Sequence, residues 1–248
     1  MSTSASRIRR RTVTIACAVL AVLLLLIVGV LVWVNIVMQG TRSAALEVWR
    51  NPAIQVTSTD NSVILTPTEG ASETGLVFIP GAKVDPYAYM YKLSGIVEET
   101  GATVVITKPT LNLAFFDTRP LTTFTDQAPD VSTWFVGGHS LGGVRACQLA
   151  DSPEVSGLVL FGSYCANDLA DSDLEVISIS GSNDGLSTPD KIAAAAHLLP
   201  TTTTFVEIDG ANHASFGDYG VQPGDGTATI SSSEVQEQIT EALAALGL

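Results

Sequence analysis

The feature that most constrains this chain is a serine between two glycines, in the segment Gly138-His139-Ser140-Leu141-Gly142. Residues 133–136 before it indicate the end of a buried strand, which we expect the adjacent glycines to break, and residues 144–149 after it predict a helix. A serine on a sharp strand-to-helix turn has a strained backbone, and side chains two positions to either side would collide. The segment therefore predicts a nucleophile elbow. A glycine-rich turn with an incidental serine is the alternative.

The N-terminal region has a different character. Residues 13–38 are almost wholly apolar, and Thr14 and Asn35 are their only clearly polar members. A helix of this length measures about 39 Å, enough to cross a hydrocarbon core of about 30 Å. The run predicts a transmembrane anchor. The alternative is a signal peptide cleaved near Ser43-Ala44-Ala45.

Charge predicts the orientation of this anchor. Residues 1–12 carry four arginines, whereas only Arg42 and Arg50 lie shortly after the apolar run. By the preference of basic residues for the cytoplasmic side, the N-terminus stays in the cytoplasm. We expect a single-pass protein of the cell membrane with its remaining domain outside the cytoplasm.

The charge of that remaining region is strongly negative. All 25 acidic residues but only eight of the 12 basic residues lie after position 38, which gives the region a formal charge of −17. Such a surface favours solubility and repels nucleic acid, and no basic stripe is present. We expect no nucleic-acid partner.

The chain after the anchor predicts a connector, residues 39–51, and one domain, residues 52–248. Short apolar runs alternate with helical patterns, which indicates an α/β fold with a mostly parallel sheet and helices on both faces. An antiparallel hairpin is expected at its N-terminal edge. The predicted strands are 54–58, 62–66, 76–79, 103–106, 133–136, 157–161, 175–180 and 203–208, and the predicted helices are 86–100, 144–149, 189–199 and 232–246.

The cysteines define no disulfide framework. Cys17 lies in the apolar run, Cys147 in the helix after the elbow, and Cys165 just beyond a strand. A location outside the cytoplasm permits a disulfide. From these positions alone we expect Cys147 and Cys165 to be buried, unpaired thiols.

Reactive side chains follow three of the predicted strands. Because the carboxyl ends of parallel strands meet at one edge of a sheet, Ser140, Asp184 and His213 are expected to lie close together. A serine hydroxyl becomes a nucleophile when an imidazole takes its proton, and a carboxylate orients that imidazole. These residues predict a catalytic triad.

Other residues compete for two of these roles. His139 is adjacent to the serine, where its ring cannot readily turn back, and His197 lies near a helix end, where it suits the helix dipole. His213 is therefore the preferred base. Five further carboxylates are candidates for the acid, and Asp184 is preferred because it follows a strand end between turn formers: Asp168, Asp171, Asp173, Asp209 and Asp218.

An acyl-transfer site also requires two N–H donors for the developing oxyanion. Leu141, after the serine, is the first candidate, and Ala82, after the 76–79 strand, is the second. Lys83 is a candidate substrate contact, or else an ordinary exposed residue. Phe115, in the segment 111–116, is a candidate apolar wall, or else part of the core. Only nine residues, 166–174, are available before the 175–180 strand for a segment that could cover the site, so the site is expected to be open.

Four segments together resemble the α/β-hydrolase superfamily: 80–89 (PGAKVDPYAY), 111–116 (LNLAFF), 137–143 (GGHSLGG) and 212–220 (NHASFGDYG). The order Ser, Asp, His is that of the superfamily's triad. The resemblance covers residues 76–248 and is closest to small bacterial members, often membrane-anchored, that are related to dienelactone hydrolases. It implies that Ser140, Asp184 and His213 form the triad. Dienelactone hydrolases use cysteine as nucleophile, so their substrate is not carried over.

The sequence thus predicts a membrane-anchored serine hydrolase that cleaves small carboxylic esters or related acyl compounds. Two alternatives remain: an acyltransferase acting on a cell-envelope acceptor, and a catalytically silent binding ectodomain. We expect no cofactor and no metal site, because the spacing of Asp218 and Asp225 lacks the ligand count of a calcium loop. The sequence does not indicate the oligomeric state.

Overall fold

The computed structural model describes the backbone of residues 2–248 and the side chains from Arg7 onward. The chain divides into two units, one that ends at Ile36 and one that runs from Val37 to Leu248. In the first unit, helix α1 (Ser2–Asn35) contains a 29-residue stretch from Arg7 that is long and apolar enough to cross a membrane. That stretch would measure about 43 Å as a helix, more than the thickness of a hydrocarbon core.

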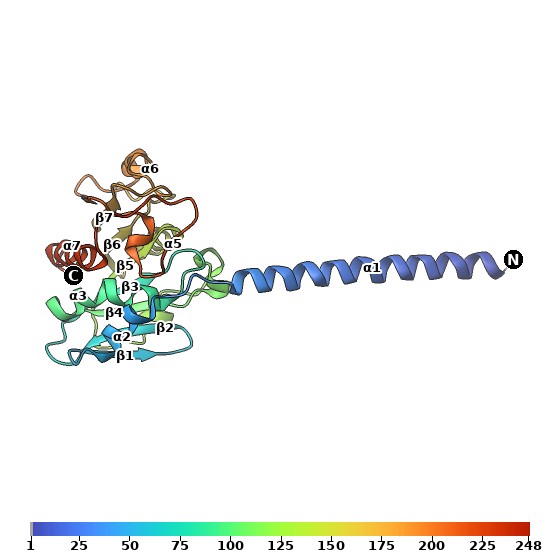
Figure 1. The fold of residues 1–248 in the computed structure, drawn as a ribbon, viewed down its shortest axis with the longest axis horizontal. Coiled ribbons are helices and arrows are strands. Elements are labelled where there is room, and N and C mark those ends of the chain that lie inside the picture. The colour runs from blue at the N-terminus through green and yellow to red at the C-terminus, as the bar shows by residue number, and fades with distance from the viewer. Residues whose placement is uncertain (1) are drawn as a thin grey trace. The chain divides into compact units, whose positions relative to one another are not determined.

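The second unit is built on one eight-stranded sheet with the order β1-β2-β4-β3-β5-β6-β7-β8 (Figure 1). The pairs β1–β2 and β2–β4 are antiparallel and all other pairs are parallel. This confirms the α/β prediction and the hairpin at one edge. The strands are β1 (Ile54–Ser58), β2 (Ser62–Pro67), β3 (Thr74–Ile79), β4 (Thr103–Thr107), β5 (Thr133–His139), β6 (Val155–Phe161), β7 (Glu175–Gly181) and β8 (Thr204–Ile208).

Helices cover both faces of the sheet, as predicted (Figure 1). On β3, Leu76 and Phe78 face one core with residues of α2 (Arg42–Arg50), α3 (Met90–Thr100) and α7 (Ser232–Ala245). Val77 and Ile79 face the other core, with residues of α4 (Thr122–Thr125) and α5 (Leu141–Ala150). Alternate side chains of a strand point to opposite faces, so a doubly covered strand is apolar throughout.

The strand order changes direction between β3 and β5. From β3 the chain crosses to β4 on one side and then to β5 on the other, so connections leave the β3–β5 boundary in opposite directions. Ligands of open α/β sheets bind outside the carboxyl ends of strands at such a boundary. Here those ends are Ile79 and His139.

Two of the predicted helices include 3₁₀ turns, and α5 begins at Leu141, three residues before the predicted start. The predicted helix 86–100 begins as a 3₁₀ turn, η1 (Pro86–Tyr89), before α3. The predicted helix 189–199 is α6 (Pro189–Ala195) followed by a 3₁₀ turn, η4 (Ala196–Leu198).

The expectation that Gly137 and Gly138 break their strand was wrong. β5 continues to His139, and both glycines pair with β3 and β6. A Cβ on Gly137 would lie 2.8 Å from the Cβ of Val159 on the neighbouring strand. Glycine is therefore required at this position by close packing within the sheet.

The expectation of unpaired thiols was also wrong. Cys147 of α5 and Cys165, beyond β6, form a disulfide with their Cα atoms 5.6 Å apart. α5 packs against β6, which brings the residue after the strand within bonding range of the helix. The sequence separation of 18 residues did not reveal this proximity.

Candidate active site

Ser140 occupies a strained turn between β5 and α5. Its φ is 52° and its ψ is −124°, a conformation that is unusual for a residue with a side chain and costs on the order of 1–3 kcal/mol. A Cβ on Gly138 would overlap the backbone of Gly142, which explains the pair of flanking glycines. The serine itself is half-buried, and its N–H donates to the carbonyl of Phe161 at 3.1 Å.

Asp184 and His213 form a buried hydrogen-bonded pair. Nδ1 of His213, which begins the 3₁₀ turn η5 (His213–Phe216) after β8, lies 2.8 Å from Oδ2 of Asp184, which follows β7. The other carboxylate oxygen, Oδ1, accepts from the N–H groups of Leu186 and Ser187 at 2.8 and 2.7 Å. Both oxygens are thus engaged, and the carboxylate is held facing the imidazole.

The other candidate acids lie elsewhere in the described part of the chain. Asp168, Asp171, Asp173 and Asp209 are exposed, and Asp218 pairs with Lys92. Of the six carboxylates considered from the sequence, Asp184 alone is hydrogen-bonded to the His213 ring.

Ser140 and His213 share neighbours at the end of β6. Phe161, which accepts from the Ser140 N–H, precedes Gly162, and a Cβ on Gly162 would lie 3.2 Å from Nδ1 of His213 and 3.0 Å from Oδ2 of Asp184. Among the described residues, Nε2 of His213 has no hydrogen-bond partner and no bond joins it to Ser140. Catalytic hydrogen bonds are often long in proteins without substrate.

Two backbone N–H groups, one directly after the serine and one in the loop after β3, are the predicted oxyanion donors. Within the described chain, neither the N–H of Leu141 nor that of Ala82 donates to another residue. The two loops touch, because a Cβ on Gly142 would overlap the carbonyl oxygens of Ile79 and Pro80 at the end of β3.

Comparisons with known proteins identify the family to which this fold belongs. The model of the alpha/beta hydrolase family matches residues 75–237. The chain belongs to the α/β hydrolase family. A comparison with curated protein sequences gives no match.

Solved structures share the fold at low sequence identity. Carboxyl esterase 2 of Tuber melanosporum has a TM-score of 0.57 and 11% identity, with 84% of this chain and 91% of that chain covered. Est1E of Butyrivibrio proteoclasticus has a TM-score of 0.56 and 10% identity, with 78% and 98% covered. The serine hydrolase without lid XC6422 of Xanthomonas campestris has a TM-score of 0.54 and 13% identity, with 79% and 95% covered.

The segment where many α/β hydrolases carry a lid is short in this chain. Between β6 and β7 the described chain forms no helix and no strand. Asp168, Asp171 and Asp173 of this segment are exposed, whereas Leu169 and Leu174 are buried against the core. No folded lid is formed by this connection.

The two predicted substrate contacts lie on connected loops. Lys83 is half-buried, has a positive φ of 58°, and donates its N–H to the carbonyl of Asn112 at 2.8 Å. Phe115, in the 3₁₀ turn η3 (Ala114–Phe116), is 74% exposed, so the alternative that it forms core was wrong. η3 packs against α5, the helix that follows the serine.

The sequence did not reveal a role for His139. Its ring is buried, its Nδ1 lies 2.9 Å from the Tyr89 hydroxyl, and that hydroxyl accepts from the N–H of Gly81 at 2.9 Å. The hydroxyl thus bridges the N–H of Gly81 and Nδ1 of His139. This network joins the elbow to the loop that carries Ala82.

His139 also contacts the candidate base. The ring centroids of His139 and His213 are 4.4 Å apart. Burial, and next the neighbouring His213 ring, lower the pKa of His139 well below its usual value, and a contact with the His213 backbone offsets this only in part. A neutral ring therefore lies beside His213 and adds no competing positive charge. The sequence signal was weak, because a histidine next to the serine fits many roles.

The sequence did not indicate that Asp225 contacts the backbone of the turn that carries His213. Its carboxylate accepts from the N–H groups of His213 at 3.1 Å, Ala214 at 2.9 Å and Gly185 at 3.1 Å. It therefore links the loop after Asp184 to the turn that carries His213. From the sequence, its glycine-rich surroundings indicated only a turn.

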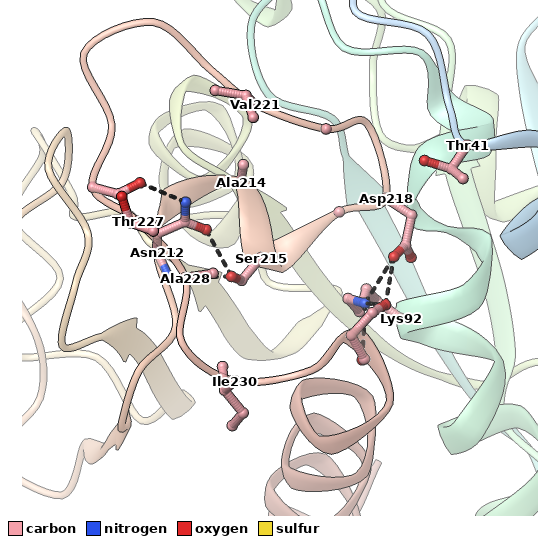
Figure 2. Close-up of a pocket in the computed structure, with 14 residues that line it drawn as sticks. Thr41, Lys92, Asn212, Ala214, Ser215, Asp218, Val221, Thr227, Ala228 and Ile230 are labelled. Atoms are coloured by element: carbon pink, nitrogen blue, oxygen red, sulfur yellow. Dashed lines mark hydrogen bonds and ion pairs between the residues drawn. The ribbon is translucent and has the colours of Figure 1, made fainter.

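A cavity of about 410 Å³ is lined in part by η5, the turn that begins with His213, and Figure 2 shows its lining residues. Ala214 and Ser215 line it, whereas Ser140 and His213 do not, so it is separate from the candidate active site. At its edge, the buried Lys92 ammonium donates to Asp218 Oδ1 at 3.0 Å and to Ser232 (Figure 2). Burial lowers the pKa of Lys92, and the Asp218 carboxylate counteracts this shift.

Proposed function

We propose that this protein is a serine hydrolase that cleaves carboxylic esters through an acyl-enzyme intermediate. Ser140 is the nucleophile, His213 the general base and acid, and Asp184 the residue that orients His213. The N–H groups of Leu141 and Ala82 form the oxyanion hole.

The observation that carries this proposal is the buried pair of His213 and Asp184 beside a strained serine turn. With Nδ1 committed to Asp184, the base has Nε2 for proton transfer. The carboxylate stabilises the imidazolium that forms when His213 accepts a proton. The strained φ of Ser140 offers a second support, because strain persists where function requires it.

The reaction follows from these positions. Nε2 of His213 takes the proton of Ser140 while Oγ bonds to the ester carbonyl carbon, and the carbonyl electron pair moves to oxygen. The two N–H groups stabilise that oxyanion. Collapse breaks the bond to the alcohol, which leaves with the proton from His213. Water, deprotonated by His213, then attacks the acyl group, and the acid is released as Ser140 regains its proton.

The membrane anchor is part of the proposal. The four arginines at the start of α1 favour a cytoplasmic N-terminus and an extracytoplasmic catalytic domain. The disulfide between Cys147 and Cys165 supports this location, because disulfides persist in oxidising compartments.

The full chain in detergent, assayed with p-nitrophenyl acetate, tests the chemistry. Ser140→Ala, His213→Ala and Asp184→Asn are each expected to lower kcat by about 10³-fold or more, the range seen when triad members are removed. Far-UV circular dichroism checks that each variant is folded.

Matched controls come from the same residue types. His197→Ala and Asp168→Asn replace exposed side chains away from the site and are expected to retain the activity of the parent protein. Turnover by Ser140→Ala within tenfold of the parent would contradict the assignment of the nucleophile.

A further inference from the structure

The loop of residues 110–116, here called the aromatic loop, exposes large apolar side chains. Phe115 and Phe116 are 74% and 50% exposed, and their rings meet edge to face with centroids 5.6 Å apart. Leu111, with a φ of 56°, is 38% exposed. The loop is ordered by its own hydrogen bonds, because the Asn112 N–H donates to Pro109 and the Phe116 N–H donates to Leu113.

Backbone hydrogen bonds join the aromatic loop to the start of the domain. The Asn112 carbonyl accepts from the N–H of Lys83 at 2.8 Å, and the Lys83 carbonyl accepts from the N–H of Met38 at 2.7 Å. The Met38 carbonyl in turn accepts from Asp85 at 2.9 Å. Two such bonded steps correspond to roughly 10 Å between the backbones of Met38 and Asn112.

Met38 is also close along the chain to the apolar helix. It is three positions from Asn35, the last residue of α1. Three residues extend over at most about 10 Å. Chain connectivity alone therefore limits the backbone of Asn112 to within about 20 Å of the last residue of α1, which is at the bilayer surface when α1 spans a membrane.

The segment from Lys108 to Pro120 carries less exposed negative charge than the domain as a whole, which suits a membrane surface. Between Lys108 and Pro120 the chain has one carboxylate, Asp117, which is buried and bonded to Arg119. The segment thus presents no exposed carboxylate, although the region after position 38 carries a formal charge of −17. Repulsion of anionic headgroups is therefore weaker here than over the acidic parts of the surface.

The same segment adjoins the proposed oxyanion donor. Lys83, which bonds to the aromatic loop, directly follows Ala82. We propose that the aromatic loop inserts into the headgroup region of the membrane that holds α1, and that the preferred substrates are amphiphilic esters whose carbonyl lies at that surface. This inference rests on the proposed ester hydrolysis and on the proposed anchor.

A depth measurement tests the docking without requiring catalysis. Phe115→Cys in a Cys17→Ser background is labelled with an environment-sensitive fluorophore and reconstituted as the full chain in phosphatidylcholine vesicles. We expect quenching by nitroxide lipids and protection from a water-soluble quencher. Phe205→Cys is the matched control, because this phenylalanine is 50% exposed on β8, at the far edge of the sheet. The control is expected to show the reverse.

A kinetic measurement tests the substrate class. The double variant Phe115→Ser/Phe116→Ser is compared with Phe205→Ser on p-nitrophenyl palmitate in the same vesicles and on p-nitrophenyl acetate in solution. The rate on the palmitate ester divided by the rate on the acetate ester is expected to fall by about tenfold in the double variant, the effect of losing an aromatic contact that is buried in the membrane. The same ratio is expected to stay constant in Phe205→Ser.

The outcomes separate the two proposals. A label at position 115 that is accessible to the aqueous quencher overturns the docking. Protection without lipid quenching, dependent on the protein-to-lipid ratio, also overturns it and indicates self-association of two chains. Lipid quenching in a protein that hydrolyses neither ester supports the docking and contradicts the proposed chemistry. An unchanged rate ratio in the double variant overturns the substrate preference.

Discussion

The disulfide between Cys147 and Cys165 gives the most quantitative prediction. The two residues are 18 positions apart, and closing a loop of that length in the unfolded chain lowers its entropy enough to stabilise the fold by about 3 kcal/mol. The bond ties α5, the helix after Ser140, to the segment after β6. Its loss should therefore destabilise the elements that hold the elbow.

The assay is urea unfolding of the full chain in detergent, followed by tryptophan fluorescence. The double variant Cys147→Ala/Cys165→Ala is expected to unfold at a urea concentration lower by about 1–2 M, which is 3 kcal/mol divided by a typical slope for this size. Reductant should shift the parent protein by a similar amount. Cys17→Ser is the control, since Cys17 is a free, exposed cysteine of α1 and its loss should change nothing.

Equal midpoints for the parent protein and the double variant, with and without reductant, would refute this reasoning. A shift in the variant without a shift on reduction would assign the loss to the cavities left by two buried sulfur atoms. Free thiols in protein isolated from membranes, measured by alkylation and mass spectrometry, would also contradict the oxidising location proposed for the domain.

Three further predictions concern buried groups of the second unit. The pKa of His139 is lowered in the folded state, so below about pH 6.5 the unfolded chain binds a proton that the folded chain does not. The free energy of unfolding should therefore fall with decreasing pH, by at most about 1.4 kcal/mol per pH unit. This slope should be smaller in His139→Asn. Urea titrations at pH 7, 6 and 5.5 measure it, and an unchanged slope would exclude the assignment. Lys92→Met leaves Asp218 as an uncompensated buried charge and should lower the free energy of unfolding by about 3–5 kcal/mol. The double variant Lys92→Met/Asp218→Leu should recover much of this stability. Equal losses of stability in the two variants would argue against a buried ion pair. Gly138→Ala forces a methyl group into the backbone of the elbow and should lower stability by about 1–3 kcal/mol, and thermal unfolding at parental temperature would show that the turn accommodates a side chain.

The fold was predictable because its strands are short, buried and apolar. Runs such as Leu76 to Ile79 and Thr103 to Ile106 are covered on both faces, so local composition alone identified them. The elbow was predictable for a steric reason, since the two glycines that the turn requires lie within one segment of five residues. The alternation of strands and helices then implied which loops share one edge of the sheet.

What the sequence did not reveal depends on contacts between distant residues. Tyr89 and His139 are 50 positions apart, and His213 and Asp225 are connected through a loop with no regular pattern. The partner of Cys147 was hidden for the same reason. Gly137 looked like a strand breaker because the neighbouring Val159, which requires its small size, lies on another strand.

The central claim is that Ser140 is an activated nucleophile, and covalent labelling tests it most directly. Membranes that contain the full chain are treated with a fluorophosphonate probe, and the adduct is located by peptide mass spectrometry. The proposal predicts a single adduct on Ser140, slower labelling of Asp184→Asn and none of Ser140→Ala. Labelling of Ser140→Ala at the rate of the parent protein, or an adduct on a different serine, would contradict it.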